Sequence, residues 1–130
     1  MRIYTILKKI AQRVFAIKDY VVEEGSSGIW TYQKWNSGIA ECWGQIAAPG
    51  GTTTSSEGGL YWRSFYQSLP AGLFNTTPKP IPAPKGNWIG GVVINDNTSK
   101  NAVQGYVWGS RNGNTPGQIA VILLVKGTWK

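Results

Sequence analysis

Two runs of alternating residues flank Ser37 and Gly38: IWTYQKWN at residues 29–36 and IAECWGQ at residues 39–45. Alternation of apolar and polar side chains is typical of a strand with one face toward a core and the other toward water. A Ser-Gly pair between two such strands suits a tight reversal of the chain. The stretch therefore predicts an antiparallel β-hairpin.

Two registers of this hairpin are compatible with the sequence. A two-residue loop would place Lys34 opposite Glu41 and Tyr32 opposite Trp43. A three-residue loop would shift the pairing by one residue, so that Gln33 faces Glu41 instead. We prefer the first register, because it pairs opposite charges and two aromatic rings on one face.

The sequence after the hairpin continues in short segments of β type. LYWRSFYQ at residues 60–67 predicts an aromatic strand, and residues 47–59 before it predict a loop. Five prolines exclude a helix from residues 68–86 and allow at most an edge strand. Three more strands are expected at residues 88–95, 102–108 and 118–126. We therefore expect a mainly β fold, an antiparallel β-sandwich or barrel.

The run IAVILLV at residues 119–125 departs from alternation. A strand that is apolar at every position is typical of one that is dry on both faces. In a single sandwich of this size, one face of most strands meets water. The run therefore indicates that this strand also packs against another subunit.

The N-terminal residues follow a period of three and a half. Their apolar side chains are spaced alternately by four and three residues, the a/d pattern of a heptad repeat. Isoleucine at the d positions disfavours parallel dimers, so we predict a coiled-coil helix over residues 1–24 that joins a homotrimer. The alternative is an amphipathic helix lying on its own domain. The expected trimer interface consists of Ile3, Leu7, Ile10, Val14, Ile17 and Val21.

A Gly-Ser segment at residues 25–28 separates this helix from the β region. Glycine and serine interrupt helices and form flexible linkers. We therefore expect three parts: the helix at 1–24, a joint at 25–28, and an aromatic-rich β head domain at 29–130.

The inventory of reactive side chains is small. The 130 residues include no histidine, one cysteine (Cys42) and six acidic residues. These counts exclude a disulfide framework, a Cys/His zinc site and catalysis by an imidazole base. Glu41 would form a glycosidase-like pair with Glu57 or Asp96 only by an accident of folding. We expect no enzyme, no catalytic or metal-ligating residue and no cofactor, and Cys42 is expected to be a small buried apolar side chain.

Charge and hydropathy bear on partners and compartment. Lys and Arg total 13 against six acids, which gives a net charge of +7 without any block of like charges. The excess favours any polyanion, whether a nucleic acid, an acidic cell-wall polymer or an anionic membrane. Because no block of like charges typical of a nucleic-acid-binding tail is present, we expect no nucleic acid as partner. Basic residues interrupt every apolar run near the N-terminus, so we expect no signal peptide and synthesis in the host cytoplasm. Because the run at 119–125 is too short to cross a bilayer, we expect no membrane insertion.

Aromatic side chains are the richest feature of the β region. Most of them are needed for the core of so small a domain, but rings beside loops can stack on sugars. Trp88 follows the Pro-rich segment, and Trp108 precedes a Gly/Asn-rich turn that contains Arg111. We take Trp88, Trp108 and Arg111 as candidate glycan-binding residues.

The segment GIWTYQKWNSGIAECWG at residues 28–44 resembles a block in fibre and minor structural proteins of phages and prophages of Gram-positive bacteria. Residues 65–78 look like the strand and Pro-containing loop of the same proteins. The closing GTWK at 127–130 looks like their Gly-x-Trp-Lys end. The resemblance implies a virion protein whose trimeric β head stands on a helical stalk, and it carries over no catalytic or metal residue.

Our hypothesis from the sequence is a homotrimeric phage head or tail fibre, located in the virion. Its N-terminal helix would dock on other virion proteins, and its β head would bind a host cell-surface polysaccharide or wall polymer. The rivals are a monomeric carbohydrate-binding module, a single-stranded nucleic-acid-binding protein and, more remotely, a small glycosidase.

Overall fold

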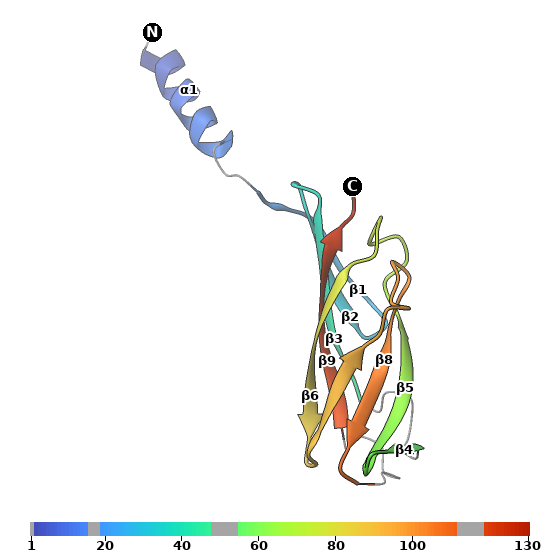
Figure 1. Ribbon diagram of the computed structural model, residues 1–130. Helices are drawn as coiled ribbons and strands as arrows, with labels where there is room; N and C mark the ends of the chain where they lie inside the picture. The colour runs from blue at the N-terminus through green and yellow to red at the C-terminus, as the bar shows by residue number, and fades with distance from the viewer. Residues whose placement is uncertain (1, 16–18, 48–54, 112–118) are drawn as a thin grey trace.

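One helix and nine strands make up the part of the chain that the computed structural model describes, which is residues 2–15, 19–47, 55–111 and 119–130 (Figure 1). Helix α1 stands clear of the strands. The bounds are α1 Arg2–Phe15, β1 Val21–Ser27, β2 Trp30–Trp35, β3 Ile39–Ile46, β4 Ser55–Glu57, β5 Leu60–Ser68, β6 Lys79–Gly86, β7 Gly90–Ile94, β8 Ala102–Gly109 and β9 Ile119–Thr128.

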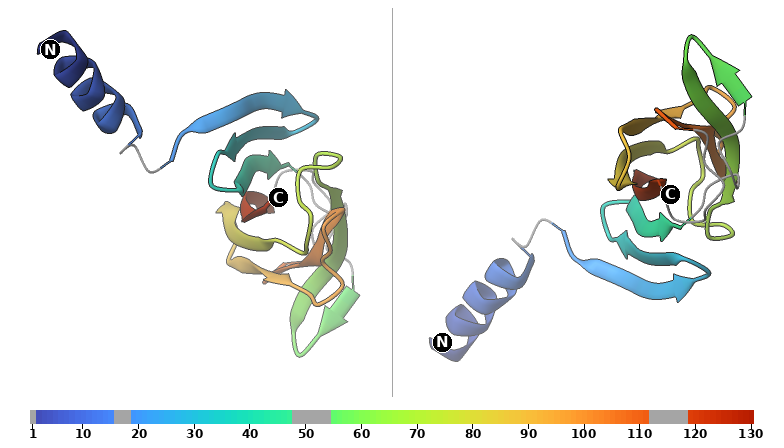
Figure 2. Two further views of the ribbon diagram at one scale, coloured as in Figure 1. Left: turned by 90° about the horizontal axis from the view of Figure 1, so that it is seen from above. Right: turned by 90° about the horizontal axis from the view of Figure 1, so that it is seen from below.

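The strands form two antiparallel sheets that face each other across one core (Figure 2). Sheet A has the order β1-β2-β3-β9-β6, and sheet B has the order β4-β5-β8-β7. Both orders end in free edges, so the mainly β prediction is confirmed as two open sheets and the closed barrel is not formed. The buried core side chains are Trp30, Ala40, Cys42, Phe65, Leu69, Leu73, Phe74, Val103, Val107, Ile119, Val121, Leu123 and Val125.

The β2–β3 hairpin forms where the sequence predicts it, but the preferred register is wrong. Gln33, not Lys34, is the partner of Glu41. The N–H of Gly38 donates to the carbonyl of Trp35 at 3.0 Å, and Gly38 has a φ of 100°. This closes a three-residue loop, in which the left-handed third position suits glycine. Turn geometry therefore overrides the complementary side-chain pairs.

The two charged residues of the rejected pairing find other partners. The Nζ atom of Lys34 lies 3.1 Å from an Oε atom of Glu23 on β1. The indole N–H of Trp35 donates to the Glu41 carboxylate at 3.3 Å. Lys34 therefore forms its ion pair with a residue of β1 and not within the β2–β3 hairpin.

The N-terminal helix is shorter than the predicted 1–24: the structure describes α1 over Arg2–Phe15, and residues 21–24 belong to β1. Val21, expected at an a position of the coiled coil, begins β1 and pairs with Trp35. The Gly-Ser segment is not a free joint: its first three residues belong to β1, and Gly28 turns the chain into β2 with a φ of 59°. Pairing with β2 satisfies the backbone groups on one side of this segment, which a free linker would leave to water.

Asp19 fixes the entry of the chain into sheet A. Its carboxylate accepts hydrogen bonds from the hydroxyl and the N–H of Ser37 and from the N–H of Tyr20. These bonds to the charged form, led by that of the Ser37 hydroxyl, lower the pKa of Asp19 below its ordinary value. The carbonyl of Tyr20 in turn accepts from the N–H of Asn36. The start of β1 is thereby tied to the tip of the β2–β3 hairpin.

Strand β6 confirms that the Pro-rich segment allows only an edge strand. It pairs with β9 alone, at one end of sheet A. Prolines occupy positions 80, 82 and 84, and alternate residues of a strand direct their N–H groups to the same side. Since proline has no N–H, this edge offers few donors to a further strand.

Strand β9 lies between β3 and β6 in the larger sheet, but it is not dry on both faces in the single chain. Val121, Leu123 and Val125 are fully buried, whereas Ile122 and Leu124 are 42% and 40% exposed. The prediction of two dry faces is therefore wrong for one chain on its own. The outer face of β9 remains apolar and open to solvent.

The other strands agree with the sequence in place and type. β5, β7 and β8 lie within a few residues of the predicted segments. The predicted loop at 47–59 contains one short strand that the sequence did not suggest, β4, which pairs with β5. Cys42 is fully buried, as predicted.

Candidate functional site

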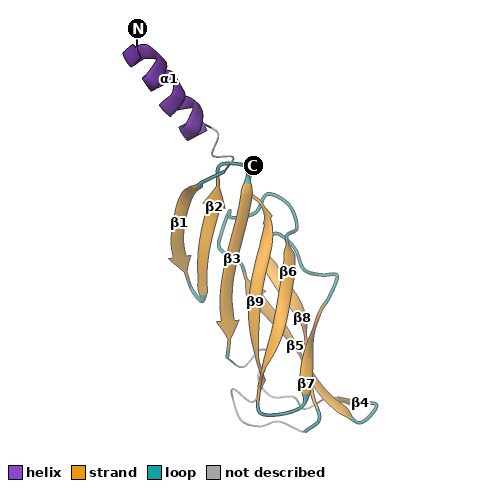
Figure 3. Ribbon diagram, turned by 90° about the vertical axis from the view of Figure 1, so that its left-hand side faces the viewer, coloured by secondary structure: helices purple, strands orange, loops and turns teal. Residues whose placement is uncertain are grey.

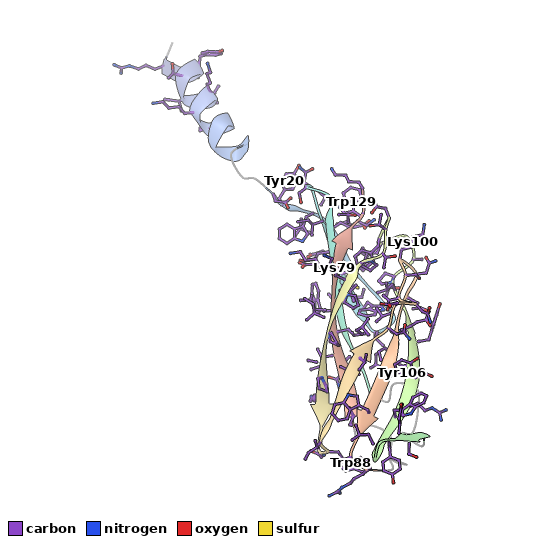
Figure 4. All side chains as sticks on the ribbon, in the orientation of Figure 1. Tyr20, Lys79, Trp88, Lys100, Tyr106 and Trp129 are labelled. Atoms are coloured by element: carbon purple, nitrogen blue, oxygen red, sulfur yellow. The ribbon has the colours of Figure 1, made fainter. Side chains whose placement is uncertain are left out.

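An aromatic groove lies on the outer face of sheet B, the face turned away from the core. It holds a volume of about 540 Å³ where β4, β5 and β8 come together. Figures 1 and 4 place this region at the end of the head that is far from α1. We call it the aromatic groove, and its lining residues are Glu57, Leu60, Trp62, Tyr106 and Trp108.

Strand alternation and pairing bring the three rings together. Phe65 on β5 and Val107 on β8 point into the core, so Trp62, Tyr106 and Trp108 lie on the opposite face. The register places Trp62 directly opposite Trp108. The rings of Trp62 and Tyr106 meet edge to face, with centroids 5.3 Å apart and planes at 85°. Such a contact stabilises a ring pair by about 0.5–1.5 kcal/mol, so the rings are held before any ligand arrives.

Strand β7 makes room for the groove through a missing side chain. Gly91 is the β7 residue opposite Trp108. A Cβ atom at this position would lie 2.6 Å from atoms of the Trp108 ring. The glycine therefore lets the indole lie close to the backbone of β7, which shapes the side of the groove.

The groove combines flat apolar surfaces with a few polar groups. Glu57 ends β4 and is paired with Leu60 across the tight turn that joins β4 to β5. Its carboxylate can accept hydrogen bonds, while the Tyr106 hydroxyl and the indole N–H groups can donate them. Aromatic faces with a few directional polar groups suit the apolar face and hydroxyl groups of a sugar ring. A carboxylate in the same site repels a phosphate backbone.

The aromatic groove includes one of the three predicted glycan-binding residues. Trp108 lines the aromatic groove. Trp88 is half-buried and packs against the core, and the guanidinium of Arg111 lies 5.6 Å from its ring centroid. Trp88 and Arg111 are not among the described residues that line the groove. Their contact is a cation–π pair at the end of the head, and glycan binding there stays a prediction.

Three lining residues have no distinguishing signal in the sequence: Trp62, Tyr106 and Glu57. Alternation in LYWRSFYQ and AVQGYVWG does place Trp62 on one face of its strand and Tyr106 with Trp108 on one face of another. The missing information was which strands are neighbours, because β5 and β8 are separated by more than thirty residues of sequence. The pairing of these strands creates the groove.

Helix α1 carries the second predicted surface, the heptad stripe. Ile3, Leu7 and Ile10 are 76%, 59% and 53% exposed in the single chain. Figure 1 shows the helix projecting away from both sheets, so the alternative of a helix lying on its own domain is not what the structure has. Of the remaining predicted positions, Val14 lies in α1 and Ile17 lies outside the described residues.

Two observations concern metal ligands and the reactive thiol. No group of three or more His, Cys, Asp or Glu side chains gathers among them in a way that could hold a metal ion. Burial raises the pKa of the Cys42 thiol to about 12, so the reactive thiolate is scarce at neutral pH. Within the described ranges, no helix has the length and apolarity needed to span a bilayer.

Comparison with known proteins gives one informative similarity. No protein-family model matches the sequence, and no curated protein matches it. Among solved structures, the chain is similar to an N-truncated R1-type pyocin tail fibre, with a TM-score of 0.52 and 14% sequence identity. The alignment covers 90% of this chain and 93% of that one. At this low identity the similarity shows a shared fold: the chain has the antiparallel β architecture found in a tail-fibre fragment.

Proposed function

We propose that the protein is a phage fibre-type structural protein that trimerises through α1 and binds a host-surface glycan through the aromatic groove. The main support for this proposal is the fold that the chain shares with a tail-fibre fragment over 90% of its length. The exposed stripe of α1 supports assembly, because an amphipathic helix of 14 residues is marginal in water without a partner. The sequence resemblance to phage and prophage fibre proteins points the same way.

The virion is the proposed location, with other virion proteins as partners of the stalk. The sequence resemblance suggests a Gram-positive host, whereas the structural neighbour carries no information on that point. The host therefore stays a prediction from the sequence alone.

Glycan binding is assigned to the groove because of its lining. Three aromatic rings form the surface, and the edge-to-face pair of Trp62 and Tyr106 is preformed. The Glu57 carboxylate favours a neutral sugar with hydroxyl donors over a polyanion. Three copies of the head on one stalk would act together, so that weak individual sites yield strong attachment.

The test of this function joins a mass measurement to a binding measurement. Light scattering should give three times the chain mass of 14.2 kDa, and Leu7→Ser on the stripe should reduce it while Lys8→Ser does not. Trp62→Ala should abolish retention on host cell walls or on a glycan array. Tyr66→Ala is the matched control, since Tyr66 is an aromatic residue of the same strand, 63% exposed and outside the groove lining.

The possible results distinguish the proposed function from its alternatives. A wild-type mass of 14.2 kDa with groove-dependent glycan binding would identify a monomeric carbohydrate-binding module. Retention of single-stranded oligonucleotides that falls steeply with salt would favour the nucleic-acid reading. Equal retention of wild type and Trp62→Ala would remove the groove from the proposal.

A further inference from the structure

The outer face of sheet A carries an apolar row in the single chain. Trp43 on β3, Leu124 on β9 and Ile81 on β6 are directly opposite one another across three neighbouring strands. They are 38%, 40% and 60% exposed. Ile122, one row away on the same face, is 42% exposed. Figure 3 shows these strands lying side by side across the broad sheet.

Charged side chains divide the same face into an acidic and a basic half. Glu24 on β1 pairs with Gln33, which pairs with Glu41 on β3. On the other half, Lys126 of β9 lies between Glu41 of β3 and Lys79 of the edge strand β6, directly opposite each of them. Like charges directly opposite each other destabilise a sheet. Within the described part of the chain, the structure records no ion pair that would neutralise either lysine.

We propose that this outer face of sheet A packs against a second copy of the chain, with the basic half of one copy over the acidic half of the next. The proposal rests on the assembly part of the proposed function and adds a head interface to the helical one. Contact would bury the apolar row and bring carboxylates to the basic half, where Lys79 on the edge strand faces only Lys126. It also accounts for the run IAVILLV, whose outward side chains are dry only if another subunit covers them.

A second copy of the chain complements this face better than an unrelated partner does, because the face carries both an acidic and a basic half. An acidic partner would match the lysines of the basic half but repel the Glu24 half. A neighbour related by rotation presents the complementary half to each. Repetition of this head-to-tail contact closes a ring when each copy is rotated by a third of a turn, as in a trimer.

The width of the sheet allows a charge-swap test to distinguish contacts between copies from contacts within one chain. Glu24 and Lys79 lie on β1 and β6, the two edge strands of the five-stranded sheet. At about 4.8 Å per strand spacing they are roughly 19 Å apart, well beyond the screening length of about 8–10 Å at physiological salt. Any coupling between them must therefore arise between copies.

The first experiment measures assembly of the full chain at several concentrations by sedimentation. Leu124→Glu should weaken assembly by roughly a hundredfold or more, because the contact would bury an unpaired carboxylate. Ile89→Glu is the control, since Ile89 is 78% exposed and outside sheet A. Glu24→Lys and Lys79→Glu should each weaken assembly by roughly fivefold at low salt, and the double reversal should restore it.

The second experiment detects the head contact even if the helices hold the oligomer together. Ala83 is an exposed residue of β6 opposite Ile122, and the native Cys42 is fully buried. A maleimide should label Ala83→Cys slowly in the oligomer and quickly when Leu124→Glu is added. Ile89→Cys should be labelled quickly in both backgrounds.

The outcomes separate this interface from the proposed function. A trimer in which Ala83→Cys is labelled as quickly as Ile89→Cys would overturn the sheet A contact and leave the helical trimer standing. A wild-type monomer at all concentrations would refute both. Slow labelling that persists in a monomer, or that requires an added acidic protein, would contradict a second copy as the occupant.

Discussion

Leu123 and Leu124 are neighbours in β9 that the fold sends to opposite faces of sheet A. Leu123 is fully buried between the two sheets, whereas Leu124 is 40% exposed on the outer face. Replacing each in turn by alanine removes the same atoms from two different environments. The difference in the free energy of unfolding therefore measures the face assignment directly.

The magnitudes follow from burial. A fully buried leucine replaced by alanine loses transfer free energy and leaves a cavity, so Leu123→Ala should cost about 2.7–5 kcal/mol. Full burial of a leucine side chain is worth about 1.5–3 kcal/mol, and Leu124 is only partly buried in the single chain. Leu124→Ala should therefore cost about 1 kcal/mol within one chain, with any larger loss appearing only where copies assemble.

The assay is unfolding in guanidinium chloride, followed by tryptophan fluorescence at several protein concentrations. The Leu123→Ala loss should be the same at every concentration, because it arises inside the chain. The Leu124→Ala loss should grow when the wild type is oligomeric. Equal losses for the two variants at low concentration, or a larger loss for Leu124→Ala, would refute the inward and outward assignment of β9.

Three further outcomes are expected. Gly91→Ala should displace the Trp108 indole, since the new Cβ would lie 2.6 Å from ring atoms, and should weaken glycan retention while the circular dichroism of the head is kept. The lowered pKa of Asp19 means that its bonds to Ser37 stabilise the fold above the ordinary value of 3.8 and are lost as the pH falls through the folded pKa. The unfolding midpoint should thus drop in that acid range less for Asp19→Asn than for wild type. The buried Cys42, with its pKa raised to about 12, should react with a thiol reagent at pH 8 only at the rate of unfolding, and rapid labelling of the native protein would contradict its burial.

Much of the β architecture was predictable because the signals are local. Alternation placed the strands of the hairpin, and the absent N–H groups of proline placed β6 at an edge. The hairpin register was missed because two loops differ by one residue. The choice depended on the left-handed Gly38 and on Glu23, which pairs with Lys34 from another strand.

The N-terminal stripe shows the limit of periodicity. Its pattern continues through Val21, yet the helix ends at Phe15 and Val21 enters β1. A heptad pattern contains no information about the hydrogen bonds that the same residues can form with the edge of a sheet, and these bonds compete with the helix. The hydrogen bonds of Asp19 to Ser37 add to that competition, and they join residues 18 apart in sequence.

The sequence by itself determined the composition, which is poor in reactive side chains and rich in aromatic residues. It also determined the local structure, an amphipathic helix followed by short strands, because periodicity depends on residues that are close along the chain. Only the tertiary structure decided that Trp62 meets Tyr106 and Trp108, and that Trp43, Leu124 and Ile81 align in one exposed row. Both surfaces arise from pairing between strands far apart in sequence. Such pairing depends on how the two sheets pack across one core, and no local pattern specifies it.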